Sequence, residues 1–127
     1  IELAKGYESG IAGRRDYREA VKLYRRARTS EIRRDNSPYL QATYHLGRLY
    51  LKGLGVSSDP KKGLKFIREA ANGNVNAALI EMGKIYEEGR YVGKDLNSAL
   101  DYFLESKKRG FLDSEDDIVR IKKKLNS

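Results

Sequence analysis

The sequence predicts an all-α fold, a right-handed α-α superhelix (solenoid) of stacked helical hairpins. The first observation behind this prediction is that the chain of 127 residues repeats itself with a period of 36 residues, a length typical of helical repeat arrays. The second is that residues which start and stop helices bracket two amphipathic runs in each repeat. One hairpin cannot bury its apolar face alone, so the repeats are expected to stack.

The repeat is carried by small, aromatic and acidic residues at fixed positions. A shift of 36 positions brings identical residues together: Ala42 with Ala78, Gly47 with Gly83, Tyr50 with Tyr86, Gly53 with Gly89, Val56 with Val92, Asp59 with Asp95 and Leu64 with Leu100. Toward the N-terminus the shift is 43, which pairs Tyr7 with Tyr50 and Asp16 with Asp59. The longer shift indicates an insertion between Ala27 and Ala42.

Residues 1–29 form the first repeat, and residues 30–37 form the inserted connector. The leading helix of this repeat starts late, around Leu3, with no helix cap before Ile1. Its second helix follows Asp16, a good N-cap. We therefore expect the chain to be a fragment of a longer protein, in which further repeats or a signal peptide precede Ile1.

Residues 38–73 form the second repeat, where the helix signals are strongest. Ser37 is a good N-cap and Pro38 suits the first helical position, which predicts a helix running to about Lys52. Gly53 ends that helix, and Asp59 caps the next one. The second helix has its apolar residues on one face: Leu64, Ile67, Ala70 and Ala71.

Residues 74–110 form the third repeat, and residues 111–127 form a single capping helix. Asn74 and Gly110 fall where a left-handed residue is needed to end a helix. Gly47 and Gly83 lie inside helices at a cost of ~1 kcal/mol each relative to Ala, which close approach of the partner helix would offset. The capping helix spans 114–125, and three of its residues are expected to point inward: Ile118, Ile121 and Leu125.

The composition excludes several classes of protein. Hydrophobic residues make up 39% of the chain and charged residues 35%, and no apolar run approaches the ~20 residues of a membrane span. Cys is absent and His45 is the single histidine, which excludes a disulfide framework, a Cys nucleophile and a multi-histidine metal site. No signal peptide is visible, and the composition does not fix the compartment.

The charge is unevenly distributed along the chain. The net charge is +8, from 26 Lys and Arg against 18 Asp and Glu. Residues 1–77 carry sixteen basic and eight acidic side chains, whereas residues 78–127 carry ten of each. The excess therefore lies in the first part of the chain, and it permits acidic partners such as nucleic acid, anionic lipid or an acidic peptide.

No arrangement of residues points to catalysis, a metal or a cofactor. Gly89-x3-Gly93-Lys94 lacks the spacing and the Ser or Thr of a phosphate-binding loop. Glu87 and Glu88 are adjacent, so on a helix they would point about 100° apart and could not act as a pair. The acidic residues 115–117 suit the first turn of a helix. The chain is therefore predicted not to be an enzyme.

A resemblance to a known family rests on one pattern in the second repeat: Ala42-x3-Leu46-Gly47-x2-Tyr50-x2-Gly53-x-Gly55-Val56-x2-Asp59-x4-Leu64-x5-Ala70-Ala71. This pattern resembles the Sel-one-like repeat, a relative of the tetratricopeptide repeat. The third repeat matches it as well, although Ser106-Lys107 replaces the two alanines. The resemblance implies an α-solenoid whose members act as adaptors and scaffolds through protein–protein interaction.

The resemblance also implies a binding groove, because leading helices line the concave face in this architecture. The residue two before each repeat tyrosine is Lys5, Arg48 or Lys84, and Arg120 matches in the last helix. These cations are expected roughly 10 Å apart, a spacing suited to an acidic or carboxylate-ended peptide. The remaining predicted groove residues are Gln41, Tyr44, Lys52 and Ile80. The competing interpretation is that all these side chains are merely solvated.

A second candidate surface is a basic patch in the first repeat and the connector, formed by Arg14, Arg15, Arg18, Arg25, Arg33 and Arg34. Arg favours phosphate and carboxylate groups, so the alternative function is binding of nucleic acid or of anionic polysaccharide or lipid. Few aromatic residues accompany these arginines for base stacking, which favours a protein partner.

Self-association through the N-terminal end is a further expectation. The apolar side of the first hairpin is expected to be exposed there, and exposed apolar patches usually find a partner. The residues expected to form this patch are Leu3, Tyr7, Val21 and Tyr24.

Overall fold

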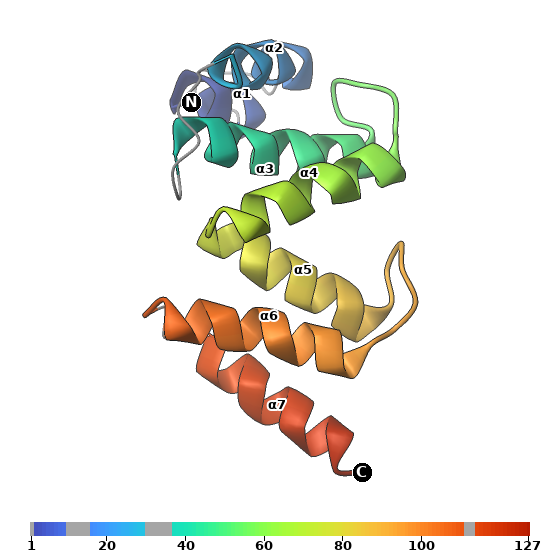
Figure 1. Ribbon diagram of the computed structural model, residues 1–127. Helices are drawn as coiled ribbons and strands as arrows, with labels where there is room; N and C mark the ends of the chain where they lie inside the picture. The colour runs from blue at the N-terminus through green and yellow to red at the C-terminus, as the bar shows by residue number, and fades with distance from the viewer. Residues whose placement is uncertain (1, 10–15, 30–36, 111–113) are drawn as a thin grey trace. The chain divides into compact units, whose positions relative to one another are not determined.

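The computed structural model describes residues 2–9, 16–29, 37–110 and 114–127. All regular structure in these ranges is helical (Figure 1). The helices are α1 (Glu2–Ser9), α2 (Tyr17–Ala27), α3 (Pro38–Lys52), α4 (Pro60–Asn72), α5 (Asn76–Glu88), α6 (Leu96–Lys108) and α7 (Glu115–Leu125). The all-α fold class predicted from the repeat is confirmed, whereas residues 30–36 of the predicted connector lie outside the described ranges.

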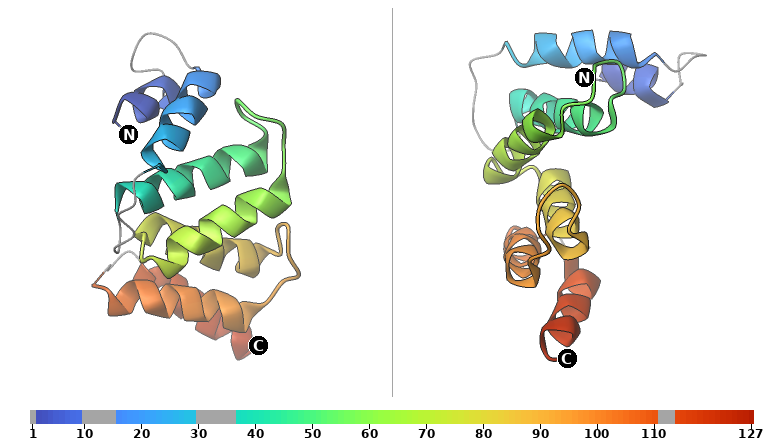
Figure 2. Two further views of the ribbon diagram at one scale, coloured as in Figure 1. Left: turned by 45° about the horizontal axis from the view of Figure 1, so that its top comes forward. Right: turned by 90° about the vertical axis from the view of Figure 1, so that its right-hand side faces the viewer.

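The helices belong to two compact units, Ile1–Val75 and Asn76–Ser127. In the first unit α1 packs on α2, α2 on α3, and α3 on α4. In the second unit α5 packs on α6, and α6 packs on α7. Figures 1 and 2 show α3 and α4 as antiparallel neighbours joined by a short loop, and they show α5 and α6 paired in the same way. Each of these pairs is the hairpin that the repeat predicts.

The helix starts lie where the capping residues predict them. The Ser37 hydroxyl accepts a hydrogen bond from the Leu40 amide at 3.3 Å at the start of α3. The carboxylates of Asp16, Asp59 and Asp95 accept equivalent bonds at 3.1–3.2 Å from amides three residues later. These bonds satisfy amides that a helix leaves without an internal partner, so capping accounts for an aspartate at this repeat position.

The helix ends are also as predicted. Gly53 follows α3 with a φ of 70°, and Gly89 follows α5 with the same value. Asn74 has a φ of 63° and Gly110 a φ of 89°. A positive φ turns the chain out of the helix, and residues with a large Cβ substituent adopt it only with strain. These positions therefore fix where each helix stops.

The glycines inside α3 and α5 allow close helix contact. A Cβ atom at Gly47 would lie 2.7 Å from Ile67 Cγ1 and 2.9 Å from the carbonyl oxygen of Gly63 on α4. A Cβ atom at Gly83 would lie 2.7 Å from the ring of Phe103 on α6. The predicted reason for glycine inside these helices is confirmed, because each one seats a residue of its hairpin partner.

Each unit has its own apolar core. In the first unit, residues of α1 to α4 form a cluster of Ala4, Ala20, Val21, Tyr24, Ala42, Leu46, Leu49, Tyr50 and Phe66. In the second unit, the cluster is Ala99, Phe103, Ile118 and Ile121, with Ile80, Tyr86, Leu96 and Leu100 packed against it.

Two expectations about apolar residues were wrong. Val21 and Tyr24 are buried rather than exposed, because α2 packs on both α1 and α3 and leaves that face covered. Leu3 is 58% exposed as expected, and the side chain of Tyr7 lies outside what the structure describes. Leu125 was expected to point inward but is 37% exposed, because α7 ends at this residue and no further turn covers it.

Candidate partner-binding surfaces

Arg48, a predicted groove residue on α3, is held by other side chains of the first unit. Its guanidinium forms an ion pair with Glu8 of α1 and lies 2.9 Å from His45 Nδ1. It also lies over the ring of Tyr44, 5.5 Å from the ring centre. Burial opposes the charge of Arg48, but the Glu8 carboxylate outweighs this effect and raises the pKa of Arg48. Much of the charge of Arg48 is therefore balanced within the unit.

Glu8 and His45 extend this contact to α2. The Tyr24 hydroxyl donates to Glu8 at 2.8 Å, and the Tyr24 ring stacks on His45 at 4.9 Å with an interplanar angle of 15°. Burial, and next the positive charge of Arg48, lower the pKa of His45 from 6.5 to about 4. The imidazole is therefore neutral near pH 7, and it links α3 to α2 through the Tyr24 ring.

Arg120, the predicted groove residue on α7, is also paired. Its Nε and Nη2 atoms each donate to Glu87 of α5 at 2.7 Å, and Nη2 also donates to Asp117 at 2.6 Å. Lys124 donates to the same Glu87 carboxylate at 2.7 Å. Glu87 is only 7% exposed, and the hydrogen bonds from Arg120 are the main cause that lowers its pKa to about 2. Arg120 therefore attaches α7 to α5.

The other predicted groove residues differ in exposure. Lys5, Gln41 and Tyr44 are half-buried in the first unit. Ile80 is half-buried in the second unit, where it packs against the core of α6 and α7. Lys52 and Lys84 are exposed, and among the described residues neither has a carboxylate within ion-pair distance. Of the predicted groove cations, these two offer charge that the fold does not already use.

Part of the predicted basic patch can be placed. Arg18 and Arg25 are exposed on α2, and Arg25 Nη2 donates to the Tyr50 hydroxyl at 2.9 Å. Arg18 lines a shallow recess of about 430 Å³ together with the loop residues Gly53, Gly55, Val56 and Ser57. Arg14, Arg15, Arg33 and Arg34 lie outside the described residues, so the structure does not test the patch as a whole.

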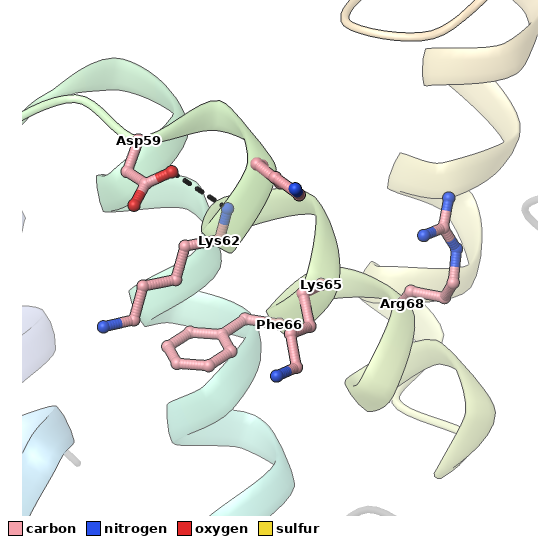
Figure 3. A pocket seen from close by; sticks show the side chains of 6 residues that line it. Asp59, Lys62, Lys65, Phe66 and Arg68 are labelled. Atoms are coloured by element: carbon pink, nitrogen blue, oxygen red, sulfur yellow. Dashed lines mark hydrogen bonds between the residues drawn. The ribbon is translucent and has the colours of Figure 1, made fainter.

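A basic surface on α4 was not predicted from the sequence. A recess of about 450 Å³ is lined by Asp59, Lys61, Lys62, Lys65, Phe66 and Arg68 (Figure 3). Figure 3 shows Lys62 and Phe66 extending from one side of α4, whereas Arg68 points to the opposite side. The spacing of Lys61, Lys65 and Arg68 by four and three residues was the signal that could have revealed it, because such residues share a helix face.

The described residues offer no sign of a metal site or a membrane span. No group of three or more acidic or histidine side chains in those ranges could share a metal ion. None of the helices there has both the length and the apolar character that crossing a bilayer requires.

The hairpins, their glycine contacts and their capping aspartates together define a helical-hairpin repeat protein. The family model of the Sel1 repeat, which is the Sel-one-like repeat, matches residues 1–29, 40–75 and 76–111. The chain therefore belongs to the Sel1 repeat family. Proteins of this family are generally protein-interaction modules and are typically non-catalytic scaffolds.

Individual relatives agree with this assignment. The chain is 28% identical over 99 residues to the chitin synthase regulator SKT5 of Saccharomyces cerevisiae. The matched residues make up 77% of this chain and 13% of the relative. The chain thus spans only a small part of that relative's length.

Two solved structures share the fold. A Sel1 repeat protein from Oxalobacter formigenes has a TM-score of 0.77 and 27% identity, covering 92% of this chain and 45% of that one. The protective antigen c5321 of uropathogenic Escherichia coli, which displays an SLR fold, has a TM-score of 0.70 and 28% identity. The match covers 88% of this chain and 22% of the antigen chain. The chain thus spans less than half of each of these proteins.

Proposed function

We propose that this chain is a non-catalytic scaffold module that binds an acidic or carboxylate-ended peptide of a partner protein along its leading helices. The observation that carries the proposal is the exposure of Lys52 on α3 and Lys84 on α5, each without a carboxylate partner among the described residues. Family membership supports a protein as the partner. The name of the yeast relative, a regulator of another enzyme, is consistent with a scaffold that acts through binding.

The predicted groove residues divide into two roles under this proposal. Arg48 holds Glu8 and so fixes α1 on α3 within the first unit, and Arg120 holds Glu87 and so fixes α7 on α5 within the second unit. Lys52 and Lys84 attract the ligand, and Lys5, Gln41, Tyr44 and Ile80 are the further predicted contact residues on α1, α3 and α5. Each exposed ion pair with a ligand contributes about 0–1 kcal/mol, so affinity depends on several contacts and falls with added salt.

A double charge reversal of Lys52 and Lys84 tests the proposal. Arg48→Glu is unsuitable, because it would place a second carboxylate beside Glu8 and disturb the fold. The double variant Lys52→Glu with Lys84→Glu should keep the helix content and melting temperature of the wild type. Its partner protein, captured from a lysate of the source cells in parallel with and without nuclease treatment, should no longer be retained.

The control is the double variant Lys122→Glu with Lys123→Glu, which changes net charge equally on exposed residues of α7. It should retain the partner. Recovery of RNA or DNA in place of protein would overturn the proposal in favour of the basic patch around Arg18 and Arg25. Equal loss in both double variants would show that only net charge matters.

A further inference from the structure

Several cations in the described ranges form ion pairs with carboxylates. Arg28 pairs with Glu69 at 3.6 Å and Arg90 with Glu88 at 2.8 Å. The lysines at the start of α4 differ, since no described carboxylate lies within ion-pair distance of Lys61, Lys62 or Lys65. All three are exposed. Their charge is therefore available to a ligand.

These lysines lie around a recess whose lining includes the aromatic ring of Phe66. Phe66 lines the α4 recess and is 8% exposed. Lys62 Nζ lies 4.8 Å from the centre of the Tyr50 ring and 5.8 Å from that of Phe66. Figure 3 shows the Lys62 side chain beside the Phe66 ring and the Lys65 side chain extending from the next turn of α4 on the other side of Phe66. The rings hold the ammonium group of Lys62 close to the protein surface.

The phenol of Tyr50 lies beside two cations, Arg25 and Lys62. The Tyr50 hydroxyl accepts a hydrogen bond from Arg25 at 2.9 Å. Burial raises the pKa of Tyr50, but Arg25 and Lys62 together outweigh burial and hold that pKa below its ordinary value. The positive charge of Lys62 thus acts on the groups around it. The recess itself is lined by three exposed lysines and Arg68 against one carboxylate, that of Asp59, so an anion would gain electrostatic energy there.

The geometry favours a peptide over a nucleic acid. Cations lie near the Phe66 ring, with Arg28 only 4.2 Å from its centre, and Tyr50 meets it edge-on at 5.8 Å. No aromatic face in the recess is left for base stacking, which binders of single-stranded nucleic acid normally provide. Lys61 and Lys65 are about 6 Å apart along the axis of α4. Alternate side chains of an extended peptide are spaced by nearly the same distance, about 7 Å.

We propose that the α4 recess binds an extended acidic segment of a partner protein, with carboxylates at alternate positions paired to Lys61, Lys62 and Lys65. This surface lies on the second helix of its hairpin, so it is distinct from the leading-helix surface of the proposed function. The two proposals are therefore tested by substitutions of different lysines.

Binding of a defined probe tests this inference. The probe is a fluorescein-labelled twelve-residue peptide with Glu at every second position and Ser between, and its binding is followed by fluorescence anisotropy. The wild type should bind it, and should not bind the same peptide with Gln in place of Glu. The double variant Lys62→Glu with Lys65→Glu should bind roughly tenfold more weakly or worse, because two attractions become repulsions.

Matched variants separate the possible outcomes. Lys122→Glu with Lys123→Glu, which lowers net charge equally, should bind as the wild type does. Backbone amide signals of residues 61–66 should shift most in NMR spectra when the peptide is added. If Lys62→Glu with Lys65→Glu does not fold, as judged by circular dichroism, the Lys62→Gln with Lys65→Gln variant replaces it.

Four outcomes would overturn the inference. The first is no binding of the Glu peptide, and the second is equal weakening by both double variants. The third is weakening by Lys52→Glu with Lys84→Glu alone, which would place this ligand on the leading helices. The fourth is tighter binding, through Lys62 and Lys65, of an oligothymidylate of equal charge, which would identify a nucleic-acid site instead.

Discussion

At the scale of single residues, the repeat pattern is explained by backbone contacts and caps. Gly47 is in the pattern because a side chain there would collide with Ile67 and with the backbone at Gly63. Asp59 and Asp95 are in it because their carboxylates cap α4 and α6. These features were predictable from sequence, since each is a local rule about one residue type at one position.

Gly47→Ala tests the close approach of α3 and α4. Alanine is the better helix former by about 1 kcal/mol, yet the added Cβ would lie 2.7 Å from Ile67 Cγ1 and 2.9 Å from a backbone oxygen. We expect a net loss of about 1–3 kcal/mol in the free energy of unfolding, measured by urea denaturation. Gly93→Ala is the control, because nothing lies within 4 Å of a Cβ there. Equal stability of the two variants would contradict the packing described for Gly47.

His45 makes a prediction about pH. Its pKa is about 4 in the folded chain against 6.5 ordinarily, so between these values the unfolded chain binds the proton and the folded chain does not. His45 should therefore reduce stability as pH falls from about 6.5 toward 4, and it should have no such effect above 6.5. The variant His45→Phe, which keeps a ring against Tyr24, should lose this part of the pH dependence.

The measurement for His45 is direct, because it is the single histidine of the chain. Its imidazole proton signal in NMR spectra should titrate with a midpoint near pH 4. A midpoint near the ordinary value would show that the ring is not enclosed between Tyr24 and Arg48.

At the scale of helices, long side chains join elements that the repeat pattern treats as separate. Arg28, just after α2, donates to the Thr43 hydroxyl at 2.8 Å and to the Tyr39 hydroxyl at 2.9 Å on α3. It also pairs with Glu69 and lies over Phe66 on α4. This role of Arg28 was not predictable from the sequence, because contacts between distant elements leave no periodic signal.

Arg28→Ala should therefore loosen α2 from the hairpin of α3 and α4. Loss of charged hydrogen bonds to partly buried groups should cost about 1.5–3 kcal/mol. Hydrogen exchange of the α2 amides should accelerate more than that of the α4 amides. Arg26→Ala, at an exposed neighbour on the same helix, should leave both rates unchanged. Similar rates in the two variants would mean that Arg28 does not hold α2 in place.

The candidate site was less predictable than the helices. The column of Lys5, Arg48, Lys84 and Arg120 followed from register, but register does not reveal which cations already have partners. Glu8 and Glu87 lie 40 and 33 residues from the arginines that they bind. Only folding brings them together. The α4 lysines were overlooked for the converse reason, since the sequence does not show that they have no carboxylate within ion-pair distance among the described residues.

At the scale of the whole molecule, surface exposure bears on self-association. Of the apolar residues expected to form an N-terminal patch, Leu3 is exposed, whereas Val21 and Tyr24 are in the core. A patch reduced to Leu3 and its surroundings should give weak association, which a net charge of +8 opposes at low salt. Sedimentation velocity should show a coefficient that rises slightly with concentration in high salt and stays constant for Leu3→Glu. A coefficient independent of concentration in the wild type would contradict association.

The side chain of Val119 on α7 limits how closely another helix could pack there. In the repeat register, Val119 of α7 occupies the position of Gly83, and Lys122 that of Tyr86. Val119 is 52% exposed, so its isopropyl group stands where a following helix would have to sit as closely as α6 does on α5. Another helix could therefore pack on α7 as closely as α6 packs on α5 only if Val119 were replaced by glycine.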